Sequence, residues 1–242
     1  MNSPTITPID FSSAHIQQTI KLLKAAASDH QPTALATAFG AESVVLIHLI
    51  AELKLNISTF SLDTGRLPEQ TYQVAAEIQQ RYPITIDWYF PEAASIEQLN
   101  RERGPNSFRD SVENRQHCCS LRKVLPLQRA LAGKRGWLSG QRHAHSAERA
   151  NLLATSWDPN RQLTKILPLL TWTDDQVWEF IHTHNIPYNS LYDQGYSSIG
   201  CAPCSRATTA GEDSRAGRWW WEQQTNKECG IHADYFSGGS GI

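Results

Sequence analysis

Residues 33–63 read TALATAFGAESVVLIHLIAELKLNISTFSLD, and this stretch decides the fold class. A short β-rich run, TALATAF, precedes a longer apolar run, SVVLIHLIAELK, and a second β-rich run, ISTFSLD, follows. Two short strands joined by a segment of helical length are typical of a βαβ unit, in which the strands are parallel. The stretch therefore predicts an α/β fold.

The same alternation continues beyond this stretch. A helix is predicted over 68–82, a strand over 84–90 (ITIDWYF) and a helix over 94–103, and further strands are predicted at 136–140 and 164–170. Repeated βα units place helices on both faces of a mostly parallel sheet. We therefore expect a doubly wound α/β architecture.

Two more helices flank this pattern. Residues 11–28 predict an N-terminal helix outside the sheet. The run Thr173-Asp174-Asp175-Gln176 fits a capping box and predicts a helix whose apolar face carries Val177, Phe180 and Ile181. After about residue 190 the periodicity fades, which predicts a C-terminal extension over the sheet.

Length and composition limit the possible classes of protein. A chain of 242 residues that is 40% hydrophobic can bury a large core, and we expect one domain over 1–242, with an α/β core at about 30–190 and an extension at about 191–242. The net charge of −2 argues against a nucleic acid or an anionic membrane surface as the main partner. The N-terminus lacks the features of a secretory signal and no apolar run reaches membrane-spanning length, so we expect a cytoplasmic protein.

Two strand ends carry residues suited to binding an anionic ligand. Ligands of open α/β sheets bind beyond the carboxyl ends of strands. The first end, AFGAES, offers Gly40 and Ser43 at the start of a helix, and the second, SLDTGRL, offers Asp63, Thr64 and Arg66. Each could equally be an ordinary βα turn, and neither is a Walker motif, because the G-K-[ST] ending is absent.

Four of the five cysteines form two pairs. Cys118 and Cys119 are adjacent, whereas Cys201 and Cys204 are separated by two residues. In the reducing cytoplasm, metal binding, catalysis or burial explains cysteines better than disulfides do. Four thiolates fit a [4Fe-4S] cluster, and the adjacency departs from the two spaced pairs of most structural zinc sites. Zinc, buried free thiols and an adjacent-residue disulfide remain alternatives.

The fifth cysteine, Cys229, stands alone in NKECGIH near the C-terminus. A nucleophilic role would need nearby positive charge to favour the thiolate, and Arg215, Arg218 and His232 are close in sequence. Lys123, four residues after Cys119, would share a helical face with that ligand and could balance an anionic cluster. A buried apolar thiol or an incidental surface thiol is the alternative for Cys229.

The combination of these motifs resembles a known family. CCSLRKVLPL at 118–127, CAPCSRATTAGEDSRAGRWWWE at 201–222 and KECGIH at 227–232 resemble the iron–sulfur class of assimilatory sulfonucleotide reductases, the class that reduces adenylyl sulfate (APS). AFGAES and LDTGRLPEQTY are similar to the same class, so the resemblance covers nearly the whole chain.

The resemblance implies a fold, an activity and a set of site residues. The implied fold is an adenine-nucleotide α-hydrolase-like sheet with AFGAES holding phosphosulfate. The implied reaction reduces APS to sulfite and AMP through an S-sulfo intermediate on Cys229, with thioredoxin as reductant and assembly into a homo-oligomer. By the same resemblance, substrate contacts fall on Lys123, Arg142, Arg215 and Arg218, and the [4Fe-4S] ligands are Cys118, Cys119, Cys201 and Cys204. His232 is a candidate for steering the thiol or for balancing charge, and a hydrogen-bonded structural histidine is the alternative.

Some features and alternatives stay open at this point. In GQRHAHSAER, His143 and His145 replace the Arg and Gln that the family pattern has, so the substrate contacts of that loop do not carry over residue by residue. The three tryptophans Trp219, Trp220 and Trp221 fit packing under the C-terminal segment better than a role in the site. The alternatives are a reductase of 3'-phosphoadenylyl sulfate (PAPS) or of both nucleotides, an ATP-pyrophosphatase that thiolates tRNA, and a zinc-binding module without activity.

Overall fold

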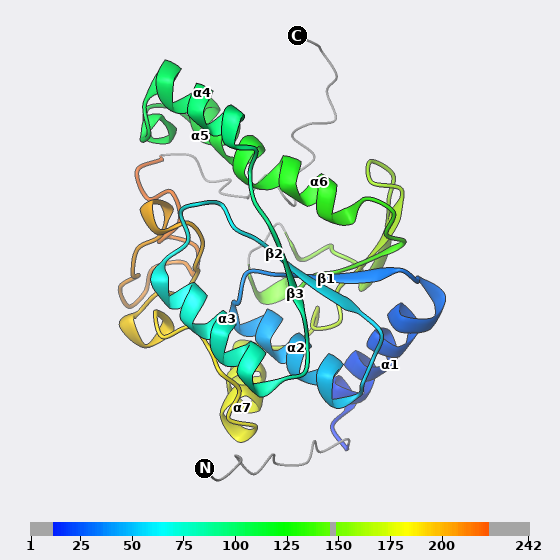
Figure 1. Cartoon of the computed structure of the whole chain (residues 1–242). Coiled ribbons are helices and arrows are strands. Elements are labelled where there is room, and N and C mark those ends of the chain that lie inside the picture. Colours follow the sequence, from blue (N-terminus) through cyan, green and yellow to red (C-terminus); the bar gives the residue numbers. More distant parts are fainter. Residues whose placement is uncertain (1–11, 146–148, 223–242) are drawn as a thin grey trace.

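A single six-stranded sheet organises the chain, with strand order β3-β2-β1-β4-β6-β5. Figure 1 labels three neighbouring strands of this sheet, β3, β2 and β1. The computed structural model describes residues 12–145 and 149–222. Five strands are parallel and β5 pairs antiparallel with β6 at one edge. The strand bounds are β1 Thr33–Thr37, β2 Ser58–Leu62, β3 Ile86–Tyr89, β4 Gly136–Leu138, β5 Thr155–Asp158 and β6 Leu163–Ile166. The predicted mostly parallel α/β sheet is confirmed.

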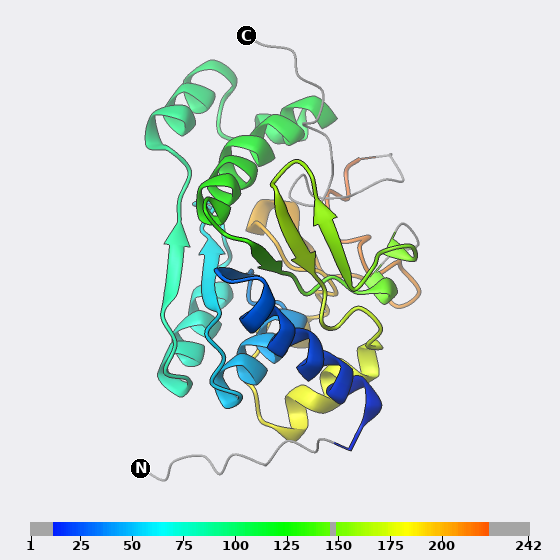
Figure 2. The same cartoon turned by 90° about the vertical axis from the view of Figure 1, so that its right-hand side faces the viewer.

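Helices cover both faces of this sheet, as Figure 2 shows. The helix bounds are α1 Ala14–Asp29, α2 Ala41–Glu52, α3 Glu69–Arg81, α4 Ala93–Arg103, α5 Val112–Cys119, α6 Leu125–Leu131 and α7 Asp174–Thr183. On one face, α1, α2, α3 and α7 share a core with β1 and β4; on the other, α6 packs on β1, β2 and β4. Consecutive residues of β1 serve the two cores, since Leu35 belongs to the first and Ala34 to the second.

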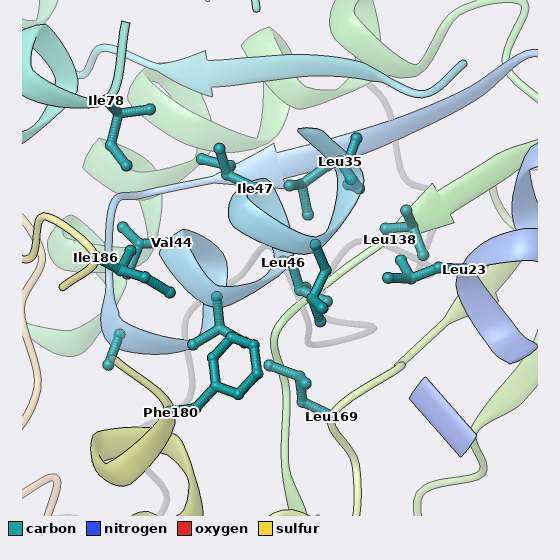
Figure 3. Packing of buried hydrophobic residues seen from close by; sticks show 14 of the residues in the cluster. Leu23, Leu35, Val44, Leu46, Ile47, Ile78, Leu138, Leu169, Phe180 and Ile186 are labelled. Carbon is teal, nitrogen blue, oxygen red and sulfur yellow. The ribbon is translucent and has the colours of Figure 1, made fainter. Parts of the chain in front are cut away.

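The larger core is built around α2. Residues Ala41 and Ser43 to Ile50 are all buried, which explains why this helix has no polar face in the sequence. Figure 3 shows Leu46 of α2 near Leu35 of β1, Leu138 of β4 and Leu23 of α1. The α2 helix is therefore fixed between the sheet and α7, and its N-terminus is held at the end of β1.

Several local predictions are confirmed, with shifts of one to four residues at the ends. The capping box of α7 is present: the Thr173 hydroxyl accepts from the Gln176 amide at 3.2 Å, and the Gln176 side chain accepts from the Thr173 amide at 3.0 Å. The N-terminal helix α1 packs through Ile16, Ile20 and Leu23. Along the described residues, no helix combines the length and the apolar character that crossing a bilayer requires.

Two regions differ from the expectation. The strand β5 was not predicted, and the segment after Cys119 is a π-helix, Ser120–Val124, between α5 and α6. Cys119 and Lys123 nevertheless line one pocket, as the predicted shared face requires, because residues four apart in a π-helix are also close to one full turn apart. Past Thr183 the described chain consists of turns and short 3₁₀ helices (Tyr192–Gln194 and Ala202–Cys204), as the loss of periodicity predicted.

Candidate functional site

A cavity of about 220 Å³ lies at the carboxyl ends of β1, β2 and β4, and we call it the central cavity. The strand order reverses between β1 and β4, because the chain leaves β1 toward β2 on one side and returns to β4 on the other. Open α/β sheets bind ligands at such a point. In the wall, Thr37 ends β1 and Ala38 follows it, Thr64 comes after β2 and Ser139 follows β4.

Four cationic side chains line the central cavity: Lys123, Arg149, Arg215 and Arg218. Arg218 is 5% exposed, and within residues 12–145 and 149–222 its buried Nε has no hydrogen-bond partner. A buried donor without an acceptor is costly, so an acceptor supplied by a ligand would stabilise it. The cavity is thus suited to an anion, and phosphate and sulfate groups match guanidinium donors well.

The four described cysteines line a second, narrow pocket, which we call the cysteine pocket. Cys118 and Cys119 end α5, Cys201 is the N-cap of the short helix Ala202–Cys204, and Cys204 is the last residue of that helix. All four are free, which excludes the adjacent-residue disulfide in this structure. Lys123 lines both the cysteine pocket and the central cavity, so the two spaces share a wall.

Positive charge surrounds the cysteine pocket. Arg66, Arg115, Arg122 and Lys123 are in its wall. Burial raises the pKa of the Cys118 thiol, against the lowering effect of Arg122, and burial together with Cys201 raises that of Cys204 to about 11. The free thiols of Cys118 and Cys204 would therefore stay protonated at neutral pH, and coordination to iron would instead remove their protons.

The chemistry of the donor set fits a cluster of four irons, in which each iron takes one thiolate. Four sulfurs share one pocket, and the cationic wall would balance the charge of an anionic cluster. Across the part of the chain that the structure describes, no group of three or more His, Cys, Asp or Glu side chains is arranged to hold a single metal ion. The nature of the bound group therefore stays a prediction from the sequence.

A larger cavity of about 600 Å³ adjoins the central cavity, and Arg149 and Arg215 line both. In its wall the Arg142 guanidinium donates to Glu42 from Nη2 at 2.7 Å and from Nε at 2.9 Å, and to Asp174 at 2.5 Å. His145 contacts the same Glu42 oxygen at 2.9 Å. Burial alone would raise the pKa of Glu42, but the hydrogen bond of His145 and the charges of His145 and Arg142 outweigh it and hold this pKa at about 2.

The residues predicted in the first strand-end loop are engaged within the protein. Gly40 is the N-cap of α2 and lines the larger cavity. The Ser43 hydroxyl donates to the Gly40 carbonyl at 2.9 Å and accepts from Thr37 at 3.0 Å. The Ala41 amide donates to the Tyr192 hydroxyl at 3.1 Å. One of the backbone amides that the sequence assigned to phosphate binding is therefore already hydrogen-bonded within the protein.

The second strand-end loop divides between two roles. Asp63 is buried, accepts from Tyr72 at 2.9 Å and from the Gly65 amide at 2.7 Å, and is not in the wall of the central cavity, the cysteine pocket or the larger cavity. Thr64 lines the central cavity and its hydroxyl contacts Cys201, whereas Arg66 lines the cysteine pocket and donates to the Pro105 carbonyl. Of the predicted binding residues, the structure thus brings Thr64, Lys123, Arg215 and Arg218 together.

Several site residues were not predicted from the sequence. Arg149 lines the central cavity, and Arg115 and Arg122 line the cysteine pocket. Arg122 immediately precedes Lys123, a predicted site residue, and this position could have indicated it. Arg115 gave no such signal, because its partner Glu222 is far away in the sequence. His143 contacts the Leu152 carbonyl at 3.0 Å, so together with His145 it shapes the loop after β4. Cys229 and His232 are outside the described residues.

The comparison with known families decides the assignment. A profile of the phosphoadenosine phosphosulfate reductase domain matches residues 32–207, a range that contains β1 through the second cysteine pair. The chain belongs to the phosphoadenosine phosphosulfate reductase domain family. This reductase-family membership confirms the expectation of an oxidoreductase, and it rests on most of the chain rather than on the cysteines alone.

Similar proteins support the same family. This member of the reductase domain family is 46% identical over 218 residues to the adenosine 5'-phosphosulfate reductase of Allochromatium vinosum, covering 90% of this chain and 85% of the relative. It is 40% identical over 220 residues to the Burkholderia cepacia protein of the same name, with 91% and 88% covered. A crystal structure of phosphoadenylyl-sulfate reductase from Candida auris aligns with a TM-score of 0.67 and 27% identity, over 81% of this chain and 98% of that one.

Proposed function

We propose that this chain reduces adenylyl sulfate to sulfite and AMP in sulfate assimilation and cysteine biosynthesis. The observation that carries the proposal is the shared wall: Lys123 lines both the cation-rich central cavity and the pocket that holds all four paired cysteines. The curated relatives with 40–46% identity, named adenosine 5'-phosphosulfate reductases, support APS as the substrate.

The first chemical step transfers a sulfo group to Cys229. The thiolate attacks the sulfur atom of APS, an S–S bond forms, the bond between sulfur and the bridging phosphate oxygen breaks, and AMP leaves with that electron pair. Both reactants are anionic, so the positive charges of Lys123, Arg215 and Arg218 would lower their mutual repulsion. His232, near the thiol in sequence, is proposed to steer it.

The second step returns the thiol and releases sulfite. A thiolate of reduced thioredoxin attacks the Cys229 sulfur, the S–S bond to the sulfo group breaks, and sulfite leaves with the bonding electrons. The second thioredoxin thiol then resolves the mixed disulfide, so that thioredoxin is oxidised by two electrons and Cys229 regains its proton. No flavin or nicotinamide is needed for this balance.

Cys118, Cys119, Cys201 and Cys204 would hold a [4Fe-4S] cluster. When bound, the cluster would supply a fixed charge and a rigid cross-link between the two cysteine segments near Lys123. The residues of this chain carry the reaction: they bind the phosphosulfate, orient it toward the tail thiol and balance its charge.

Substrate choice is the main alternative within the family, because the matching domain is named for phosphoadenosine phosphosulfate and the solved Candida auris protein is a PAPS reductase. The paired cysteines favour APS by resemblance. The test compares the turnover of APS and PAPS by anaerobically purified full-length protein with thioredoxin. We expect a preference for APS, together with iron and sulfide in the protein; a preference for PAPS would overturn the substrate assignment.

The same preparation tests the remaining alternatives. Zinc without iron or sulfide, and no reductase activity, would support the zinc-binding module. Magnesium-dependent cleavage of ATP would support the ATP-pyrophosphatase. A cytoplasmic location and a homo-oligomer remain predictions, which cell fractionation and light scattering of the purified protein would check.

A further inference from the structure

The six residues 217–222, which we call the tryptophan segment, are joined to the second cysteine pair. The backbone of Arg218 forms an isolated antiparallel bridge with Ser205, the residue after Cys204. The Arg206 amide also donates to the Gly217 carbonyl at 3.0 Å. The segment therefore lies directly beside the loop that carries Cys201 and Cys204.

The same segment is joined to the helix of the first pair by a buried ion pair. Arg115 of α5, three residues before Cys118, donates to Glu222 from Nε at 2.8 Å and from Nη2 at 3.0 Å. The two side chains are only 3% and 4% exposed. The Arg115 guanidinium also lies 4.6 Å from the ring centre of Trp219, which is itself fully buried.

Aromatic contacts extend this attachment. Trp221 lies 5.8 Å from Phe108, centroid to centroid, and the Arg109 guanidinium lies 5.6 Å from the Trp221 ring. Burial of Trp219 agrees with the predicted packing role for this residue, whereas Trp220 is 38% exposed. A bidentate, buried Arg–Glu pair has a narrow geometry, and removal of either partner leaves the other charge uncompensated. Glu222 is thus a firmly held point of the chain.

The position of Glu222 matters because of the chain that follows it. Cys229 is the seventh residue after Glu222, so its Cα can lie at most about 25 Å from that of Glu222 even in a fully extended chain. Arg218, four residues before Glu222, lines the central cavity. The tether of the thiol therefore starts beside the substrate cavity and the cysteine pocket at once.

We propose that Arg115 and Glu222 are positioning residues that fix the start of the tether of Cys229 and so set the effective concentration of its thiol at the bound substrate. The inference rests on the proposed function of Cys229 and assigns the pair no contact with substrate. Without the pair, the Glu222 side chain loses its partner, and the last contacts before Cys229 are the packing of Trp219 and Trp221. A looser attachment of this point lowers the effective concentration of the thiol at the substrate, and about a twofold loss is the smallest effect that the role predicts.

The first experiment uses full-length Glu222→Gln, which removes the charge but keeps the shape. The protein is reduced, mixed with saturating APS without thioredoxin, and quenched at short times, and S-sulfo Cys229 is quantified by mass spectrometry. We expect S-sulfonation at least twofold slower than in the wild type, with unchanged iron content and unchanged AMP affinity. The matched control is Glu92→Gln, which breaks the exposed Arg129–Glu92 pair and should leave the rate unchanged.

A second variant keeps the ion pair and lengthens the tether. Insertion of Gly-Ser-Gly-Ser after Gln224 should lower the rate of S-sulfonation in the wild-type background. The same insertion should lower the rate by a smaller factor in Glu222→Gln. If neither the insertion nor Glu222→Gln changes the rate, or if Glu222→Gln acts through lost iron or lost AMP binding, the positioning role is wrong. Absence of any S-sulfo Cys229 in the wild type would instead contradict the proposed function itself.

Discussion

The hydroxyl oxygen of Thr64 lies 3.2 Å from the sulfur of Cys201. Thr64 follows β2 and lines the central cavity, while Cys201 belongs to the cysteine pocket. The carbonyl of Thr64 accepts from Arg122 at 2.6 Å, and its hydroxyl accepts from the Arg66 amide at 3.2 Å. One threonine thus connects the end of a central strand to the second cysteine pair and to two arginines of the pocket wall.

Thr64→Val should weaken the hold on Cys201 while it preserves side-chain volume. A lost hydrogen bond of a buried group costs about 1 kcal/mol, so we expect faster loss of iron during exposure to a chelator. Thr64→Ser keeps the hydroxyl and should behave as the wild type. Equal rates of iron loss in Thr64→Val and wild type would show that this contact does not support the bound group.

Gly200→Ala should displace Arg218 from the central cavity, because a methyl group at residue 200 would collide with the Arg218 guanidinium. Hydrogen bonds to a charged group are worth about 1.5–3 kcal/mol, so AMP should bind roughly 10- to 100-fold more weakly, as measured by calorimetry. Because both changes act on one guanidinium, the double variant with Arg218→Ala should bind no more weakly than Arg218→Ala alone. Additive losses would contradict this explanation.

Glu42→Gln should alter the stability of the protein at acid pH. The pKa of Glu42 is about 2 in the folded protein and 4.5 ordinarily, so its ionised form stabilises the fold above pH 4.5, and this contribution is lost as the pH falls toward 2. This difference between the two pKa values corresponds to a contribution of roughly 3 kcal/mol to the free energy of unfolding. Glu42→Gln should unfold at a lower temperature than wild type at pH 7, and the gap should narrow between pH 4.5 and 3. A constant gap would argue against the Arg142 and His145 pairing.

His48 makes a separate contribution at a higher pH. Its ring is fully buried, with Nδ1 2.9 Å from the Tyr82 hydroxyl. Burial, then the charges of His184 and Arg81, lower the pKa of His48 from 6.5 to about 3. Because the unfolded chain takes up this proton first, stability should fall as the pH drops from 6.5, by up to about 1.4 kcal/mol per pH unit.

The measurement for His48 is the thermal midpoint between pH 6.5 and 5, a range in which Glu42 stays ionised. The wild type should lose stability across this range, and His48→Gln should depend less on pH. An equal pH dependence of the two proteins would show that His48 is not the titrating group.

The parts of the fold predicted from the sequence are those with strong local signals. Alternation of strand and helix over residues 33–63 predicted β1, α2 and β2, and the pattern from Thr173 to Gln176 predicted the start of α7. By contrast, β5 is a short edge strand with exposed and half-buried residues, including the exposed Trp157, and it is defined by its pairing with β6. The α5 helix has a single buried apolar residue, Cys119, and so lacks an amphipathic signal.

The candidate site divides in the same way. The cysteine pairs and Lys123 were identified because their residue types and order are distinctive. Arg142 pairs with Glu42 and Arg115 pairs with Glu222, and each of these two partners is about a hundred residues away in sequence, so only the folded chain reveals these pairs. The sequence likewise gives no indication that Tyr192 occupies the Ala41 amide at the start of α2.

The central claim is that Cys229 carries the sulfo group. Its most direct test mixes reduced full-length protein with APS in the absence of thioredoxin and maps the modified residue by mass spectrometry. We expect one S-sulfo group on Cys229, released as sulfite when reduced thioredoxin is added, and none in Cys229→Ser, which should still bind AMP. Sulfite formation at the wild-type rate by Cys229→Ser would contradict the account.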